Sequence, residues 1–338
     1  MDPNLYLKEK LETCSSYQLT DDDKKLLDQG IEEYIYAKLT SKKFRKWKVD
    51  QSSEDVVKKA IHMNVAAGKP IQFTFPFGGY KLWRLASTPE VDWAEFFTIS
   101  YYCQYVAPVV AAYEPGVEFF FSSDDIIIER MDNVLKSDTD SYFASFQKLL
   151  SYFEKSFPKN MKMTISRIAD LYPDKDEYEK AVNDNLEKLQ EEYSSGQLNI
   201  DAMLIMSELN VKLDGKEDWT GLSEQEKKDK YVLGALLHHA YTAIPKRRGF
   251  VRGEDKIVIF TTPLPNIIAI GTTKTSVTKF WTGMGVLEER EDGYRDRILS
   301  PKQWEESQEN IKKTVPSDLL SMKNFKKIKI SEPLNFTS

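Results

Sequence analysis

The chain has 338 residues, 41 % of them hydrophobic, with a formal net charge of −6 and a sequence pI of about 5.4. This length favours one large domain or two unequal domains, and the composition suffices for a sizeable core. The acidic balance lacks the basic footprint of nucleic-acid-binding proteins, and no apolar run is long enough to span a membrane. We therefore expect neither nucleic acid nor a membrane as a partner.

The first residues and the cysteines bear on the compartment. The start of the chain is polar and acidic, without the apolar core of a signal peptide. Two cysteines, Cys14 and Cys103, are too few for a disulfide framework or a cysteine metal site. One bridge between them is not expected in an intracellular chain. The sequence thus predicts a cytoplasmic protein.

Residues 1–69 have the pattern of a helical segment. Thr20 is a potential N-cap followed by three aspartates, and apolar residues then recur at helical spacing. A second helix is expected around 54–63, closed by Gly68. The basic cluster at 42–48 is interpreted as a solvated helix end, because lysines complement the dipole there.

A strand is expected over 70–76, where polar and apolar residues alternate. Gly78 and Gly79 follow it and allow a ligand to approach the backbone closely. Lys81 and Arg84 are the nearest cations and can hold a phosphate or a carboxylate. The alternative is a plain loop, since glycine pairs are common in turns.

The next segment predicts a helix from Thr88 to Tyr113. Thr88 would be the N-cap and Pro89 the first helical residue, with acids in the first turn. Asp92 and Glu95 lie on one face, so they either complement the helix dipole or form a ligand-facing pair. Cys103 is interpreted as a small core residue.

The central feature is the run 117–121, which contains three consecutive phenylalanines and predicts a strand buried on both faces. Ser122, Ser123, Asp124 and Asp125 follow it directly. Open α/β sheets bind ligands just beyond the carboxyl ends of their strands, so these residues are candidates for a site. A carboxylate here can act as a general base once burial raises its pKa. The alternative is a turn that caps a helix.

The remaining elements are a helix over 141–157, a strand over 162–168 and a helical insertion at about 174–245. Alternating strands and helices predict an α/β fold with a largely parallel sheet. Three short strands near the C-terminus, at 256–260, 266–270 and 277–287, suggest antiparallel pairing. We expect an N-terminal helical segment (1–69), an α/β domain (70–312) and a C-terminal tail (313–338).

The hydroxyl-rich stretch 271–278 carries Lys274, and Lys279 follows it. Such a turn can bind an oxyanion, or it can be an ordinary hairpin loop. Lys81, Arg84, Ser123, Lys274 and Lys279 are therefore the candidate substrate-binding residues. Together with the acids, they suit a polar small molecule such as a phosphorylated one.

Metal and cofactor signatures are missing from the sequence. His238 and His239 are adjacent, so they cannot form the i, i+4 pair of a zinc helix, and His62 has no evident partner. No Gly-x-Gly-x-x-Gly follows a predicted strand, which disfavours NAD and FAD. We expect neither a metal nor a bound cofactor.

Three motifs between residues 70 and 190 resemble the isonitrile (isocyanide) synthase family, of the pyoverdine/paerucumarin-biosynthesis type. Family members show a Pro-Asp-x-x-Glu helix start, a Tyr-x-Pro-Gly turn and a strand that ends in Ser-Asp-Gly. The matching residues here are Pro89, Glu95, Tyr113, Pro115, Gly116, Ser123 and Asp124. Asp125 stands in place of the family's glycine, and the strand at 256–260 lacks the family's histidine, so the chain resembles a divergent member.

The resemblance implies a Rossmann-like fold flanked by helices. It also implies an enzyme that converts the amino group of an amino acid into an isonitrile, with ribulose 5-phosphate as the carbon donor. In that case Lys81 or Lys279 would bind the phosphate and Asp124 would act in proton transfer.

Two other functions stay open. One is a glycosyltransferase-like enzyme in which Asp124 and Asp125 hold a divalent cation beside a sugar nucleotide. The other is a non-catalytic relative that uses the fold for binding. The residues do not specify the amino acid or the oligomeric state.

Overall fold

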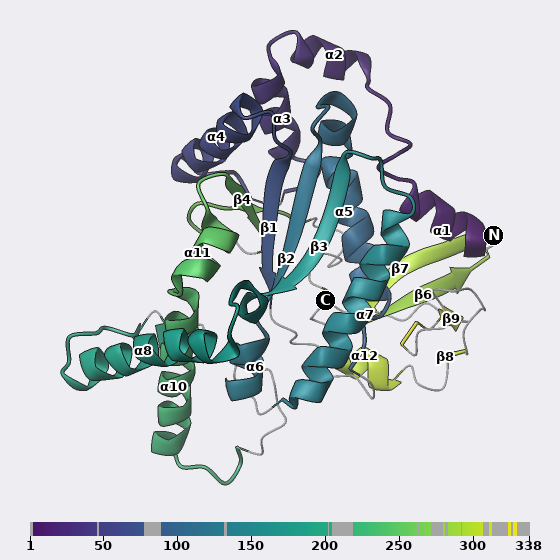
Figure 1. Cartoon of the computed structure of the whole chain (residues 1–338). Helices are drawn as coiled ribbons and strands as arrows, with labels where there is room; N and C mark the ends of the chain where they lie inside the picture. The colour runs from purple at the N-terminus through teal and green to yellow at the C-terminus, as the bar shows by residue number, and fades with distance from the viewer. Residues whose placement is uncertain are drawn as a thin grey trace.

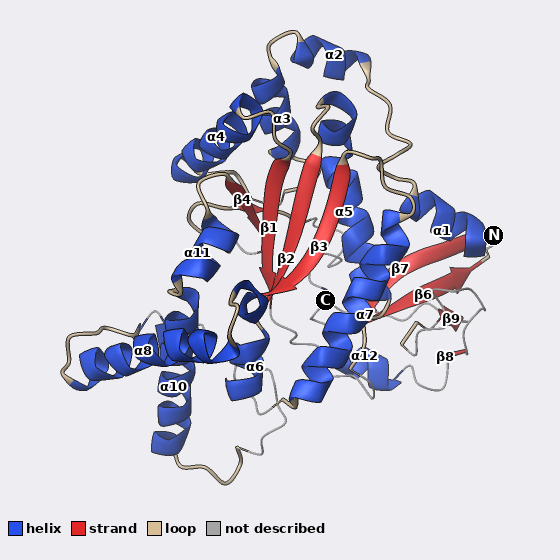
Figure 2. Cartoon of the chain, viewed as in Figure 1, coloured by secondary structure: helices blue, strands red, loops and turns tan. Residues whose placement is uncertain are grey.

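The computed structural model describes residues 3–45, 47–77, 89–131, 134–201, 203–204, 219–261, 264–271, 280, 283–291, 293–306, 311–312, 324–325 and 327–329. Its main sheet has five strands in the order β3-β2-β1-β4-β5, all parallel (Figures 1 and 2). The strands are β1 (Ile71–Phe77), β2 (Val117–Ser123), β3 (Met161–Arg167), β4 (Lys256–Phe260) and β5 (Ile268–Ala269). This confirms the predicted α/β fold with a mostly parallel sheet, and the order is that of doubly wound sheets.

The phenylalanine run of β2 is buried because helices cover both faces of the sheet. Phe119 packs on Tyr102 of α5 (Trp93–Ala112), and Phe121 packs on Phe146 of α7 (Lys136–Glu154). Phe120 points to the opposite face and contacts Phe250 of α11 (Pro245–Arg252). Side chains alternate between the faces of a strand, so one run serves both layers.

The N-terminal helices are α1 (Pro3–Leu11), α2 (Asp21–Leu27), α3 (Ile31–Leu39) and α4 (Gln51–Ala66). Of these, α2, α3 and α4 lie at the end of the sheet where the strands begin (Figure 1). Thr20 caps α2 in a capping box with Asp23, as the sequence predicts. None of the described helices combines the length and apolar character that crossing a membrane requires.

Beyond the opposite end of the sheet, where the strands end, lie α6 (Asp125–Met131), the short 3₁₀ helix η2 (Ile168–Leu171) and an arm of two helices (Figure 1). The arm consists of α8 (Lys175–Ser194) and α10 (Glu224–Thr242), which pack on one another. It corresponds to the predicted helical insertion.

A second sheet contains β6 (Met284–Arg290) and β7 (Gly293–Leu299), which pair in antiparallel fashion, together with β9 (Lys327–Lys329) and β8 (Ile311–Lys312). Helix α12 (Pro301–Glu306) follows β7. Antiparallel strands near the C-terminus are thus confirmed. Both cysteines are free and buried, and the burial of Cys103 confirms its interpretation as a core residue.

Two local predictions were wrong. Helix α5 begins at Trp93 and not near Pro89, because Asp92 is the N-cap and forms a capping box with Glu95. Strands β4 and β5 pair in parallel, not antiparallel, with Ile259 opposite Ile268. The segment after β5 is instead bonded to the N-terminal chain, where Gly271 donates to the carbonyl of Phe44.

Candidate functional site

The first three strands end at one level. Phe77 of β1 lies opposite Ser123 of β2, and Ser123 lies opposite Arg167 of β3. Helix α6 starts two residues after β2, and η2 starts directly after β3. The residues that follow these strands are therefore brought together at the carboxyl edge, where open α/β sheets bind their ligands.

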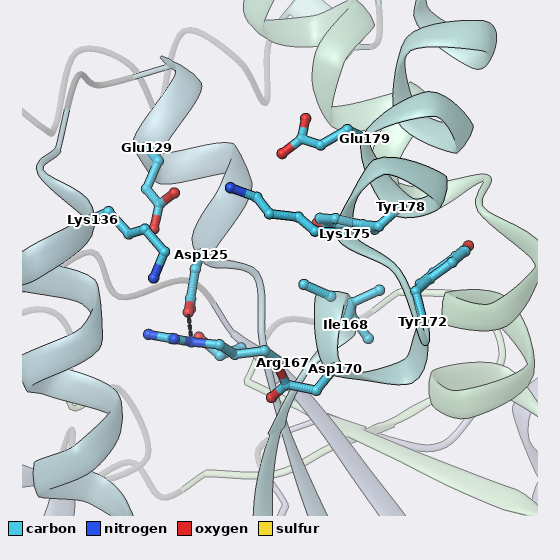
Figure 3. Close-up of a pocket in the computed structure, with 12 residues that line it drawn as sticks. Asp125, Glu129, Lys136, Arg167, Ile168, Asp170, Tyr172, Lys175, Tyr178 and Glu179 are labelled. Carbon is cyan, nitrogen blue, oxygen red and sulfur yellow. Dashed lines mark ion pairs between the residues drawn. The ribbon is translucent and has the colours of Figure 1, made fainter.

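A pocket with a volume of about 300 Å³ opens at this edge between α6, η2 and α8 (Figure 3). Its lining comes from four segments of the chain. The lining residues are Ser123, Asp125, Glu129, Lys136, Arg167, Ile168, Ala169, Asp170, Tyr172, Lys175, Tyr178 and Glu179. Hereafter these twelve residues define the pocket.

The floor of the pocket is an ion pair between Asp125 Oδ2 and Arg167 Nε (Figure 3). Arg167 also donates from Nη1 to Asp140 Oδ1 at 2.6 Å, and its guanidinium lies 4.5 Å from the ring centroid of Phe143. The arginine is thus held on three sides. Its remaining nitrogen, Nη2, is buried and has no hydrogen-bond partner in the described part of the chain.

Burial raises the pKa of Asp125 to about 7. Arg167 opposes this shift, whereas the charges of Glu129 and Asp124 add to it. A carboxyl group with a pKa near neutrality can both accept and release a proton under physiological conditions. Asp125 is therefore the group in the pocket best suited to proton transfer.

Most of the other charges of the pocket are paired. Glu129 accepts from the Thr139 hydroxyl at 2.6 Å, Lys136 donates to Asp140 at 2.7 Å, and Glu179 pairs with Arg130. Lys175 is exposed and makes no ion pair with any described residue. The walls thus combine fixed charges with the rings of two tyrosines.

Asp124, one residue earlier, belongs to a separate buried network. Its Oδ1 accepts from the Tyr241 hydroxyl at 2.6 Å, and its Oδ2 pairs with Arg247 Nη2 at 3.1 Å. Its backbone N–H donates to the Phe77 carbonyl at 2.9 Å. Burial lowers the pKa of the neighbouring His238 to about 4, so this imidazole is neutral near pH 7. The network fastens α10 and α11 to the end of β2.

The predicted site residues therefore divide into three groups. Ser123 and Asp125 line the pocket, and Asp124 holds the arm. Lys81, Arg84, Lys274 and Lys279 lie outside the described residues. The acid pair Asp92 and Glu95 is buried in the cap of α5 and does not face the pocket.

Sequence reasoning missed the two arginines. Arg167 lies at the end of the predicted strand 162–168. Parallel pairing of this strand with β2 places Arg167 opposite Ser123, and this pairing is the signal that points to Arg167. Arg247 belongs to the basic triplet Lys246-Arg247-Arg248, and only the folded chain shows that it is buried and pairs with Asp124.

The two aspartates are not arranged as a shared cation site. Asp124 pairs with Arg247 and Asp125 pairs with Arg167, so each carboxylate is already directed at its own cation. Within the described ranges, no group of three histidine, cysteine, aspartate or glutamate side chains is placed to hold a metal ion. The geometry gives no support to the glycosyltransferase-like alternative.

No protein-family model and no curated protein matches the chain. Among solved structures, the fold resembles the crystal structure of the PvcA protein (PA2254) from Pseudomonas aeruginosa, with a TM-score of 0.56 and 15 % sequence identity. The match covers 89 % of this chain and 99 % of PvcA. At this identity the likeness shows a shared fold.

Proposed function

We propose that the chain is an isonitrile-synthase-like biosynthetic enzyme that joins a carbon from a sugar phosphate to the amino group of an amino acid. Two lines support the proposal. The motifs around residues 89–124 resemble this family, and the fold matches that of the PvcA protein over nearly its whole length.

The observation that carries the proposal is the position of the pocket. It opens at the turn after β2, where the family-like motif ends in Ser123 and Asp124. The motif is a matter of residue types, whereas the pocket is a matter of geometry, so neither depends on the other. Their coincidence favours a site at which the family's chemistry takes place.

Asp125 is the proposed proton-transfer group. An amino group reacts with a sugar carbonyl only in its uncharged form, so a base must first take the proton of the ammonium. Asp125 lines the pocket and has a pKa of about 7, whereas Asp124 is engaged by Arg247 and Tyr241. Asp125, and not Asp124 as the family resemblance implies, is therefore the proposed proton-transfer group.

The phosphate of the sugar donor is assigned to Lys81 or Lys279, as the family resemblance implies. Arg84 and Lys274 remain further candidates for the same task. All four belong to stretches that follow strands β1 and β5 in the sequence. Alanine replacement of the correct lysine would raise the KM for ribulose 5-phosphate and leave the KM for the amino acid unchanged.

The test is turnover. The protein is incubated with ribulose 5-phosphate and each aromatic amino acid, and mass spectrometry searches for a product that has gained one carbon and lost two hydrogens. Asp125→Asn is expected to lower the rate at least about a hundredfold, the low end for losing a general base. Consumption of a sugar nucleotide with Mn²⁺, in place of ribulose 5-phosphate, would contradict the proposal.

A further inference from the structure

The pocket contains charges of both signs. Asp125, Glu129, Asp170 and Glu179 are acidic, and Lys136, Arg167 and Lys175 are basic. A sugar phosphate is a dianion, so the acidic side chains of the pocket oppose its binding. An amino acid is a zwitterion, and a pocket with both signs can satisfy its two charged groups at once. The mixed charges of the pocket therefore favour binding of the amino acid over binding of the sugar phosphate.

We propose that the pocket binds the amino-acid substrate and not the sugar phosphate, with the α-carboxylate on Arg167 and the α-amino group at Asp125. This assignment rests on the proposed function for the identity of the two substrates. It adds which substrate occupies the pocket and which side chains recognise it.

Arg167 is prepared for a carboxylate. Its Nε is used by Asp125 and its Nη1 by Asp140, and Phe143 supports the plane of the guanidinium. Nη2 is buried without a hydrogen-bond partner among the described residues, and so is Nε, which faces Asp125 as an ion pair. Buried donors without partners are rare, so Nη2 calls for an acceptor that the protein itself does not provide. Arginine is the side chain that recognises carboxylates most specifically.

The other walls suit an apolar or aromatic side chain. Ile168 and Ala169 contribute aliphatic surface, and the rings of Tyr172 and Tyr178 lie 5.4 Å apart between centroids. Lys246 lies over the Tyr172 ring at 4.1 Å and so keeps that ring in place. A volume of about 300 Å³ is at the small end of ligand sites, which fits one amino acid and not a nucleotide.

The test compares three ligands by calorimetry. The standard L-amino acids are screened first, and the strongest binder is then compared with its decarboxylated amine and with its deaminated acid. We expect each analogue to bind the wild type at least about tenfold more weakly than the amino acid, because each lacks one of the two charged groups.

Arg167→Met identifies the contact. It should weaken binding of the amino acid at least about tenfold more than binding of the amine, since the amine has no carboxylate to lose and responds only to the change at Asp125. A purely structural role would weaken both ligands equally. The matched control is Lys180→Met, an exposed residue of α8 that does not line the pocket and should change nothing. If Arg167→Met does not fold, the ranking of the three ligands on the wild type still decides.

The results separate this inference from the proposed function. Binding that depends on Arg167, without turnover, would support the pocket assignment and contradict the enzyme activity. Turnover with an amino-acid affinity that Arg167→Met leaves unchanged would overturn the assignment and leave the activity standing. Failure of every L-amino acid to bind, or tighter binding of ribulose 5-phosphate that is lost with Arg167, would also overturn it.

Discussion

Replacing Asp124 by asparagine is expected to lower the free energy of unfolding by about 3–5 kcal/mol, the cost of leaving one partner of a buried ion pair without its counter-charge. The side chain of Asp124 is 12 % exposed and that of Arg247 is 8 % exposed, so water cannot replace the lost carboxylate. Asparagine has nearly the same shape and can still accept the hydroxyl hydrogen of Tyr241. The lost free energy of unfolding therefore comes from the missing charge and not from a cavity.

A double variant isolates this effect. Asp124→Asn combined with Arg247→Met removes both charges, and buried pairs can often be replaced by uncharged residues at little cost. We expect the double variant to lose no more than about 1–2 kcal/mol, less than Asp124→Asn alone. The difference from additivity measures the coupling between the two side chains.

Urea unfolding followed by tryptophan fluorescence measures these free energies, since the chain has six tryptophans. A loss below about 1 kcal/mol for Asp124→Asn would refute the reasoning, as would a double variant whose loss equals the sum of the single losses. Either result would mean that Asp124 does not anchor the arm and is again available for catalysis.

Three further predictions concern other parts of the molecule. Turnover should fall as the pH drops through about 7, because Asp125 becomes protonated and can no longer act as a base. The raised pKa of Asp125 also means that this group stabilises the fold at acidic pH, and that this contribution is lost as the pH rises through about 7. Asp125→Asn should remove both pH dependences, which pH–rate and pH–denaturation series measure. Gly116→Ala should lower the free energy of unfolding by more than the roughly 1–2 kcal/mol of a left-handed backbone, because φ is 72° and the new Cβ would lie 1.8 Å from the Asn160 carbonyl oxygen. Gly196→Ala is the control, since Gly196 has the same φ but open space around it, and it should lower the free energy of unfolding only by the cost of the left-handed backbone. Urea unfolding measures both. Asp92→Ala should cost about 1–2 kcal/mol as a lost N-cap, seen as a lower urea midpoint; an unchanged midpoint would remove its capping role.

The sequence predicts those helices and strands whose formation depends on residues close together in the chain. The β2 run was identified because three consecutive phenylalanines need cover on both faces, and Pro115-Gly116 was identified as its preceding turn. The start of α5 was misplaced because two plausible caps, Thr88 and Asp92, lie close together in the sequence. Packing decided between them, since Asp92 also accepts from the Gly285 backbone of the second sheet at 3.0 Å.

The pairing of β4 with β5 depends on contacts that are distant in sequence. A short connection normally indicates antiparallel strands. Here Asn266 takes a left-handed φ of 63°, and residues 270–271 are bonded to the segment around Phe44, so β5 continues the parallel sheet. No residue type near 260 indicates a partner more than two hundred positions earlier.

The pocket lies where the sequence predicts polar residues after a buried strand. Two of the predicted residues, Ser123 and Asp125, line it. The separate roles of Asp124 and Asp125 follow from their different partners, Arg247 and Arg167, which come from distant segments of the chain. These pairings exist only in the folded chain.

The proposed reaction is tested most directly by isotope tracing. The protein is incubated with uniformly ¹³C-labelled ribulose 5-phosphate and the amino acid that binds most tightly, and the product is analysed by mass spectrometry. We predict a product that retains the amino-acid skeleton and carries one labelled carbon on its nitrogen, formed by the wild type and lost in Asp125→Asn. A folded protein that binds the amino acid but transfers no labelled carbon to it would contradict the assignment as an isonitrile-synthase-like enzyme.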